Sequence, residues 1–136
     1  MGAQIVIDAK EMLAKRFAAT LKGRFALALP GGSVAAILFP DLARAQCDWS
    51  RMAFFWGDER AVPPGDPESN YGVARRLWLD PARVPASSVH RMEADAPDLT
   101  LAARSYEDEM TRVLGTPPRL DLALLGVGPD GHVCSL

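Results

Sequence analysis

Residues 25–40 read FALALPGGSVAAILFP, an apolar run that breaks into a glycine turn and then resumes. Phe25–Leu29 is apolar at every position instead of alternating with polar residues, which is typical of a strand covered on both faces. Pro30 and two glycines end this strand, and the residues after Ser33 are expected to form a helix that ends at Pro40. Strand, turn and helix in this order predict one unit of a mainly parallel α/β sheet.

The turn of Gly31, Gly32 and Ser33 has two interpretations. The backbone N–H groups at a helix start carry partial positive charge, and glycines let a phosphate approach them closely. The same pattern is typical of a tight turn in which Ser33 caps the helix. Both interpretations stay open, because the turn has neither a Walker A lysine nor the spacing of a dinucleotide-binding motif.

Two other apolar runs end in polar residues. Residues 52–56 (MAFFW) lead into Gly57, Asp58, Glu59 and Arg60, and residues 121–136 read DLALLGVGPDGHVCSL. In the second stretch, the apolar run at 122–125 breaks into a glycine turn that delivers Asp130, Gly131 and His132 to one place. Because the ends of parallel strands lie along one edge of a sheet, we expect all three polar groups to line one crevice.

Helix signals separate these runs. We expect a strand at residues 4–7 followed by a helix that starts at Asp8, a helix capped by Ser69, and a helix from Asp98 to Gly115. Residues 89–92 are a candidate short strand. The pattern predicts one α/β domain over residues 1–136, with a three-layer fold and a mainly parallel sheet.

Three other side chains are predicted to have no role in a site. His90 has no partner at motif spacing and is expected to be structural or at the surface. Arg75 and Arg76 lie opposite the apolar face of their helix, which favours contact with solvent.

Composition limits the function. The 136 residues carry a net charge of −2 and are 49% hydrophobic. No overall positive field exists to attract nucleic acid or an anionic membrane. Cys47 and Cys134 match no metal or redox motif, so we expect reduced thiols. With no signal-peptide pattern and no long apolar run, a cytoplasmic protein is expected. The sequence does not determine an oligomeric state.

The predicted crevice suits attack by water on a small phosphorylated substrate. Histidine side chains titrate close to neutral pH, so His132 could act as a general base, with Asp130 or Glu59 fixing its tautomer. Arg60 could bind a phosphate or a developing oxyanion, oriented by Asp58 or Glu59. The alternative is a solvated turn whose charges pair with one another.

Three stretches match a known family: LPGGSVAAIL at 29–38, GDERAVPPGDPESNYGVAR at 57–75 and DLALLGVGPDGHVCSL at 121–136. The chain resembles the family shared by 6-phosphogluconolactonases and glucosamine-6-phosphate deaminases, which implies a fold of the NagB/RpiA/CoA-transferase type. The resemblance to the lactonases implies hydrolysis of 6-phospho-D-glucono-1,5-lactone to 6-phosphogluconate in the oxidative pentose phosphate pathway, with no metal or organic cofactor.

The resemblance also implies roles for individual residues. His132 would activate water with Asp130 nearby, and Arg60 would hold substrate or stabilise charge. Gly31, Gly32 and Ser33 would face the phosphate, in a substrate-binding group that includes Asp58, Glu59 and Gly131. The deaminase pattern has a tyrosine at the position of Arg60 and continues differently after His132, which favours lactonase over amino-sugar phosphate deaminase.

The resemblance departs from the family pattern at two places. Family members continue for roughly another hundred residues, the scale of a second α/β half, so we expect this chain to be an N-terminal part. Val34 stands where a threonine or serine often follows the turn. Two hypotheses remain open: the chain is part of a lactonase, or it is a non-catalytic phosphosugar-binding or interaction module.

Overall fold

The computed structural model describes residues 24–136 of the 136-residue chain. The strand predicted at residues 4–7 and the helix predicted to start at Asp8 lie outside the described residues. Within them, the elements in chain order are β1 (Phe25–Leu29), α2 (Gly32–Leu42), η1 (Trp49–Arg51), β2 (Met52–Trp56), α3 (Asn70–Ala74), η2 (Arg75–Leu79), η3 (Ala86–Ser88), α4 (Leu99–Leu114) and β3 (Leu122–Ala123).

The three strands form one parallel sheet in the order β2-β1-β3. The central strand β1 pairs along its whole length with β2, from Phe25 opposite Met52 to Leu29 opposite Trp56. Its interior is fully covered, as its apolar sequence predicts, since Leu27 and Leu29 are at most 1% exposed. Backbone bonds of Asp121 and Leu124 to β1 continue the pairing just beyond the two residues of β3.

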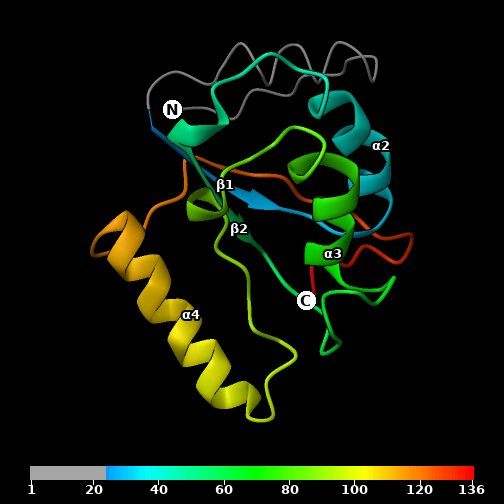
Figure 1. Ribbon diagram of the computed structural model, residues 1–136. Coiled ribbons are helices and arrows are strands. Elements are labelled where there is room, and N and C mark those ends of the chain that lie inside the picture. The colour runs from blue at the N-terminus through cyan, green and yellow to red at the C-terminus, as the bar shows by residue number, and fades with distance from the viewer. Residues whose placement is uncertain (1–23) are drawn as a thin grey trace.

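Helices cover both faces of the sheet (Figure 1). Neighbouring residues of β2 point to opposite faces, as the pleat of a strand requires. On one face, Phe54 lies against Trp78 of η2 with ring centroids 5.3 Å apart. On the other face, Phe55 stacks on His90 at 4.8 Å and meets Tyr106 of α4 at 6.2 Å. The layers are therefore α2 with α3 and η2, the sheet, and α4, which confirms the three-layer α/β prediction.

Trp78 lies at the centre of the larger core. It is fully buried, and its ring contacts Phe39 of α2, Trp49 of η1 and Phe54 of β2 at centroid distances of 5.3, 5.4 and 5.3 Å. The last two contacts are edge-to-face, the geometry that the charge distribution of aromatic rings favours. The core thereby links α2, η1 and β2, which precede Asp58 in the chain, to η2, which follows it.

Two predictions about local structure are wrong. Helix α2 begins at Gly32, with Gly31 rather than Ser33 at the cap position, and it continues through Pro40 to Leu42. The helix tolerates this proline because Phe39 and Leu42 on either side are buried in the core. Residues 89–92 form no strand; Val89 makes one isolated parallel bridge to Phe54.

Helix α4 has the predicted ends, at Asp98 and Gly115. Asp98 caps it by accepting a hydrogen bond from the Leu101 N–H at 3.0 Å, and Gly115 ends it with a φ of 88°. None of its residues is buried, so α4 depends strongly on polar contacts. The Tyr106 hydroxyl accepts from the Trp56 N–H at 2.9 Å. Burial raises the pKa of Tyr106 to about 12.

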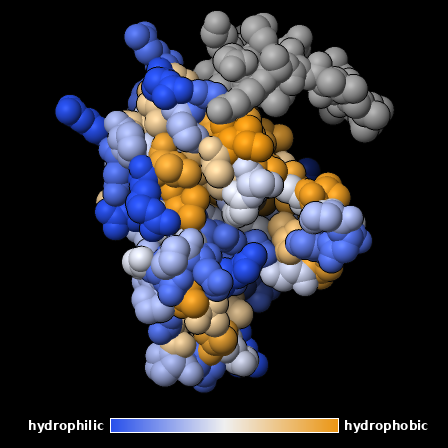
Figure 2. Space-filling model, turned by 90° about the vertical axis from the view of Figure 1, so that its right-hand side faces the viewer, coloured by the Kyte–Doolittle hydropathy of each residue, from blue (hydrophilic) through white to orange (hydrophobic). Residues whose placement is uncertain are grey.

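The surface over α2 and the C-terminal segment is mixed (Figure 2). Apolar areas alternate there with polar ones, and the exposed apolar side chains of the molecule include Ile37 at 48%, Leu125 at 52% and Val127 at 73%. Among residues 24–136, β3 pairs with β1 alone, so its second side is an open strand edge. No helix in the same range is long and apolar enough to cross a membrane.

A second polar contact of α4 makes its attachment sensitive to pH. The Glu109 carboxylate binds Arg112 at 2.7 and 2.8 Å and His90 Nδ1 at 2.8 Å. These contacts, first of all the hydrogen bonds from Arg112, lower the pKa of Glu109 to about 2. Because this pKa is depressed in the folded state, the stabilisation is present above the ordinary pKa near 4.5 and is lost as pH falls toward 2.

We expect Glu109→Gln to remove part of the acid destabilisation between about pH 4.5 and pH 2. The measurement is the free energy of unfolding in urea at a series of pH values in this range. Glu107→Gln is the matched control, because Glu107 is exposed on the same helix and makes none of these bonds. Parallel pH curves for wild type and Glu109→Gln would contradict the assigned role of this carboxylate.

Candidate active site

The turn after β2 is fixed by the carboxylate of Glu59. Its two oxygens accept hydrogen bonds from the backbone N–H groups of Arg60 and Asn70 at 2.7 Å each and of Tyr71 at 2.8 Å, and from the Ser69 hydroxyl at 3.2 Å. The first N–H groups of a helix have no partner inside the helix, so this carboxylate satisfies those of α3. Glu59 thereby joins the end of β2 to the start of α3.

Asn70 and Asp58 link this turn to the Gly31 turn and to the C-terminal segment. The Asn70 side chain is 4% exposed, and its Nδ2 donates to the carbonyl of Asp58 at 3.1 Å and to Asp58 Oδ1 at 3.3 Å. The backbone of Gly31 lies directly against it, since a Cβ at Gly31 would stand 1.9 Å from Asn70 Oδ1. The other oxygen of Asp58 accepts from the Ser135 hydroxyl at 2.6 Å.

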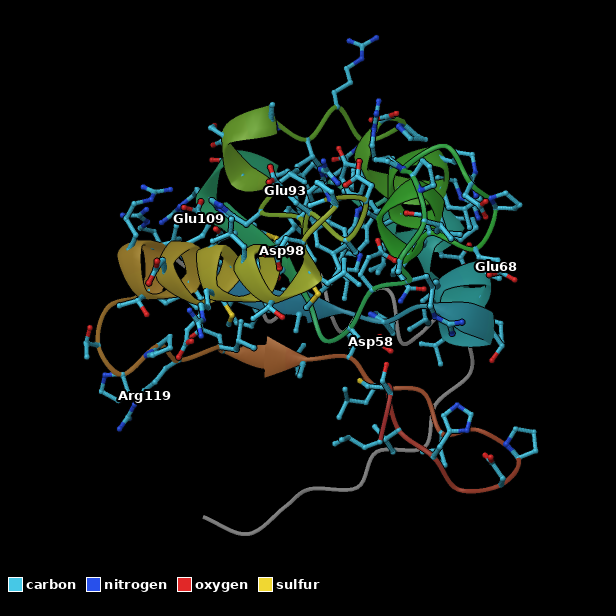
Figure 3. The ribbon with its side chains drawn as sticks, turned by 90° about the horizontal axis from the view of Figure 1, so that it is seen from below. Asp58, Glu68, Glu93, Asp98, Glu109 and Arg119 are labelled. Carbon is cyan, nitrogen blue, oxygen red and sulfur yellow. The ribbon has the colours of Figure 1, made fainter. Side chains whose placement is uncertain are left out.

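The three predicted loops therefore meet at the carboxyl edge of the sheet. Contacts run from Gly31 to Asn70, from Asn70 to Asp58, and from Asp58 to Ser135 in the C-terminal segment. Figure 3 shows Asp58 facing that segment. Within the described part of the chain, however, no hydrogen bond or ion pair joins His132 to Arg60.

His132 is held by its own turn. Its Nδ1 lies 2.5 Å from Asp130 Oδ1, and its backbone N–H donates to the same oxygen at 3.3 Å. The hydrogen bond from His132 lowers the pKa of Asp130, which is therefore ionised at neutral pH. A neutral ring that donates from Nδ1 to the ionised Asp130 leaves Nε2 as its acceptor nitrogen. Of the two carboxylates predicted to orient the ring, Asp130 contacts it, whereas Glu59 binds Arg60, Ser69, Asn70 and Tyr71 instead.

Glycines shape the turn around this ring. A Cβ at Gly128 would stand 2.2 Å from His132 Cε1, so the backbone at Gly128 must lie against the ring. Gly131 has a φ of 89°, in the left-handed region that favours glycine. The His132 side chain remains 53% exposed, so part of the ring is accessible from solvent.

Arg60 lines a cleft of about 430 Å³ beside the amino end of α2. The lining residues are Gly32, Ala36, Arg60, Pro67, Glu68, Asn70, Val73, Arg76 and Leu77. Two guanidinium groups and a helix N-terminus favour an anion in this cleft, against one carboxylate in the lining, that of Glu68. Neither Asp58 nor Glu59 contacts the Arg60 guanidinium; both carboxylates hold the backbone of the site instead.

Ser33 and Val34 lie in the first turn of α2. Ser33 is exposed and makes no capping bond, so its hydroxyl can reach a ligand at the helix start. Val34 packs toward the C-terminal segment, because a Cβ at Gly126 would stand 3.0 Å from Val34 Cγ2. The valine at this position therefore has a packing role.

The 6-phosphogluconolactonase and glucosamine-6-phosphate isomerase family matches residues 2–136. The chain belongs to this family. It is 40% identical over 119 residues to a 6-phosphogluconolactonase of Synechocystis sp., covering 85% of this chain and 50% of that protein. It is also 40% identical over 151 aligned positions to a 6-phosphogluconolactonase of Mycobacterium leprae, covering 98% of this chain and 61% of that protein.

Solved structures agree with this assignment. The crystal structure of a 6-phosphogluconolactonase from Thermotoga maritima matches with a TM-score of 0.78 and 31% identity, over 93% of this chain and 56% of that one. The crystal structure of a 6-phosphogluconolactonase from Shewanella baltica matches with a TM-score of 0.79 and 26% identity, over 93% of this chain and 55% of that one. The chain spans about half the length of the curated relatives it matches.

Two residues at this site, Asn70 and Arg76, were not predicted from the sequence to belong to it. Asn70 follows a helix cap, where a polar residue is ordinary, so nothing in the sequence marks it as the link between loops. Arg76 was predicted to face solvent; it is exposed, but it lines the same cleft as Arg60. Among residues 24–136, no group of three His, Cys, Asp or Glu side chains could hold a metal ion.

The contact between Gly31 and Asn70 gives a sharp test of how the site is assembled. Gly31 has an extended backbone, which alanine also adopts, so Gly31→Ala acts through the clash with Asn70 alone. We expect it to lower the free energy of unfolding by about 1–3 kcal/mol, the usual cost of overpacking. Chemical denaturation measures this change.

Gly65→Ala is the matched control, because a Cβ there would meet nothing within 4 Å. It should change the stability by about 0.5 kcal/mol at most. Equal stabilities of the two variants would show that Gly31 is not packed against Asn70.

Proposed function

We propose that the protein containing this chain hydrolyses 6-phospho-D-glucono-1,5-lactone to 6-phosphogluconate. The relatives support this proposal, because those at about 40% identity are named 6-phosphogluconolactonase. One observation on this chain carries it furthest: His132, oriented through Nδ1 by Asp130, presents a basic nitrogen at the sheet edge where Arg60 lines an anion-binding cleft. Placement in the oxidative pentose phosphate pathway and in the cytoplasm belongs to the same proposal.

The proposed chemistry is attack by water assisted by His132. Nε2 takes a proton from water while the water oxygen forms a bond to the lactone carbonyl carbon, which gives a tetrahedral oxyanion. Collapse of this intermediate breaks the bond from that carbon to the ring oxygen. The imidazolium returns its proton to the leaving ring oxygen, so the products are a carboxylic acid and a hydroxyl group. Asp130 stabilises the imidazolium between the two steps.

The anionic end of the substrate is proposed to lie at the start of α2. Gly31, Gly32 and Ser33 offer backbone N–H groups and a hydroxyl there, and Arg60 lines the adjoining cleft. Asp58 and Glu59 were predicted to bind substrate. Their charge and their contacts with Asn70, Tyr71 and Ser135 favour an indirect role, in which they hold the loops around the substrate.

A second candidate function is binding of a phosphosugar without turnover. The cleft with Arg60 and Arg76 is built without any contact from His132, so it can bind an anion independently of catalysis. Lactone hydrolysis by the purified 136-residue chain, beside the Synechocystis enzyme as a positive control, separates the two candidates. Binding of 6-phosphogluconate with no hydrolysis above the spontaneous rate would favour the second.

We expect His132→Gln to lower kcat by about 100-fold or more, the usual contribution of a general base. Glutamine keeps a polar side chain of similar length, so KM should change little. Continuous titration of the acid released from the lactone measures both constants. A variant with near-normal kcat would remove His132 from the chemical step.

Arg60→Gln and Arg76→Gln should each raise KM for the phosphorylated lactone by about tenfold, since a charge-assisted hydrogen bond contributes roughly 1.5–3 kcal/mol. Neither should raise KM for unphosphorylated gluconolactone as much. Arg75→Gln is the matched control, because Arg75 pairs with Asp80 and does not line the cleft. Equal effects on both substrates would contradict phosphate binding in this cleft.

A further inference from the structure

A second hollow lies at the opposite edge of the sheet. Its volume is about 730 Å³, and its lining includes the first residues of β1 and β2, Phe25 and Met52, together with the last turn of α4. The candidate active site is built from the loops that follow the carboxyl ends of the strands. Figure 3 shows this separation, with Arg119 at one end of the sheet and Asp58 at the other.

Arginines gather at this edge because of the parallel topology. Arg24 directly precedes β1, Arg51 directly precedes β2, and Arg119 lies shortly before β3. Neighbouring strands of a sheet lie roughly 4.8 Å apart, so residues that lead into parallel strands start from neighbouring positions. All three line the hollow, as does Arg112 from the end of α4.

These charges have little compensation within the described chain. Arg112 is paired with Glu109 through two hydrogen bonds, but no ion pair or hydrogen bond within residues 24–136 engages the guanidinium of Arg24, Arg51 or Arg119. The lining contains one carboxylate, Asp121, whose Oδ2 already accepts from the Ala26 N–H at 2.7 Å. Since the whole chain has a net charge of −2, this positive surface is a local concentration and not a general property.

We propose that this hollow binds a small organic anion that carries two phosphate groups. Guanidinium groups form paired hydrogen bonds with phosphate, and three unpaired ones exceed what a single phosphate requires. The volume lies within the roughly 300–1,000 Å³ of small-molecule sites. Phe25, Met52 and Val113 in the lining provide apolar surface for the organic part of the ligand. A nucleoside diphosphate and a sugar bisphosphate share this chemistry.

Isothermal titration calorimetry on the 136-residue chain tests the proposal, with four probes: inorganic phosphate, pyrophosphate, ADP and fructose 1,6-bisphosphate. All titrations use the Arg60→Gln background, which weakens anion binding at the candidate active site. We expect pyrophosphate and at least one organic probe to bind at least tenfold more tightly than phosphate. The better organic probe identifies whether the ligand is a nucleotide or a sugar bisphosphate.

Variants then locate the binding. Arg51→Gln and Arg119→Gln should each weaken binding of the best probe by about tenfold, and Arg51→Lys should fall between wild type and Arg51→Gln because it keeps the charge and loses the paired geometry. Arg104→Gln is the matched control, since Arg104 is exposed on α4 and does not line the hollow. Thermal unfolding verifies that each variant is folded. If Arg51→Gln does not fold, Arg119→Gln provides the test, because Arg119 lies in an exposed loop.

Three results would overturn the proposal: no probe binding at millimolar concentration, equal affinity for phosphate and pyrophosphate, or an equal loss of affinity in Arg104→Gln. The proposal does not depend on the lactonase function, because its readout is binding at residues outside the candidate active site.

Discussion

The carboxylate of Glu59 is the contact on which the arrangement of this molecule depends. By accepting bonds from the backbone at Asn70 and Tyr71 and from Ser69, it fixes the start of α3 against the end of β2. That position sets the direction of the chain into η2 and so places Trp78 among the aromatic rings of the core. It also places Asn70 between Gly31 and Asp58. One half-buried carboxylate thus determines core packing and site geometry together, and replacing it would leave several backbone N–H groups without partners.

Much of the fold could be predicted because its signals are local. The apolar strands β1 and β2, the Ser69 and Asp98 caps and the glycine end of α4 are all readable from a few neighbouring residues. The helix start after β1 was mispredicted because contacts far along the chain decide it: Gly31 packs on Asn70, and burial of Phe39 and Leu42 carries α2 through Pro40. The site shows the same division. His132 with Asp130 is a local pair, whereas the partners of Asp58 and Glu59, apart from the adjacent Arg60 N–H, lie 10 to 77 residues away.

The same division affects the proposed catalysis. The arginine cleft and the α2 turn lie on elements that pack into the core, but His132 lies on an exposed loop. Ser135 bonds to Asp58, Cys134 lies close to Gly57, and Gly126 lies close to Val34. The Asp130 contact holds the His132 ring within its own turn, and the other three contacts position that turn relative to the cleft. Asp58 therefore couples the two halves of the proposed chemistry, although it is not a group that the reaction requires.

The two edges of the sheet differ in how they can hold an anion. In this α/β arrangement, α2 begins at the carboxyl edge, where unpaired N–H groups and partial positive charge can bind a phosphate with few side chains. The amino edge receives the end of α4, whose carbonyl groups carry partial negative charge and repel anions. The same carbonyl groups stabilise nearby guanidinium groups, which lowers the cost of gathering arginines there. Backbone dipoles therefore assist the arginines at one edge, whereas the proposed anion binding at the other edge relies on the side chains that precede each strand.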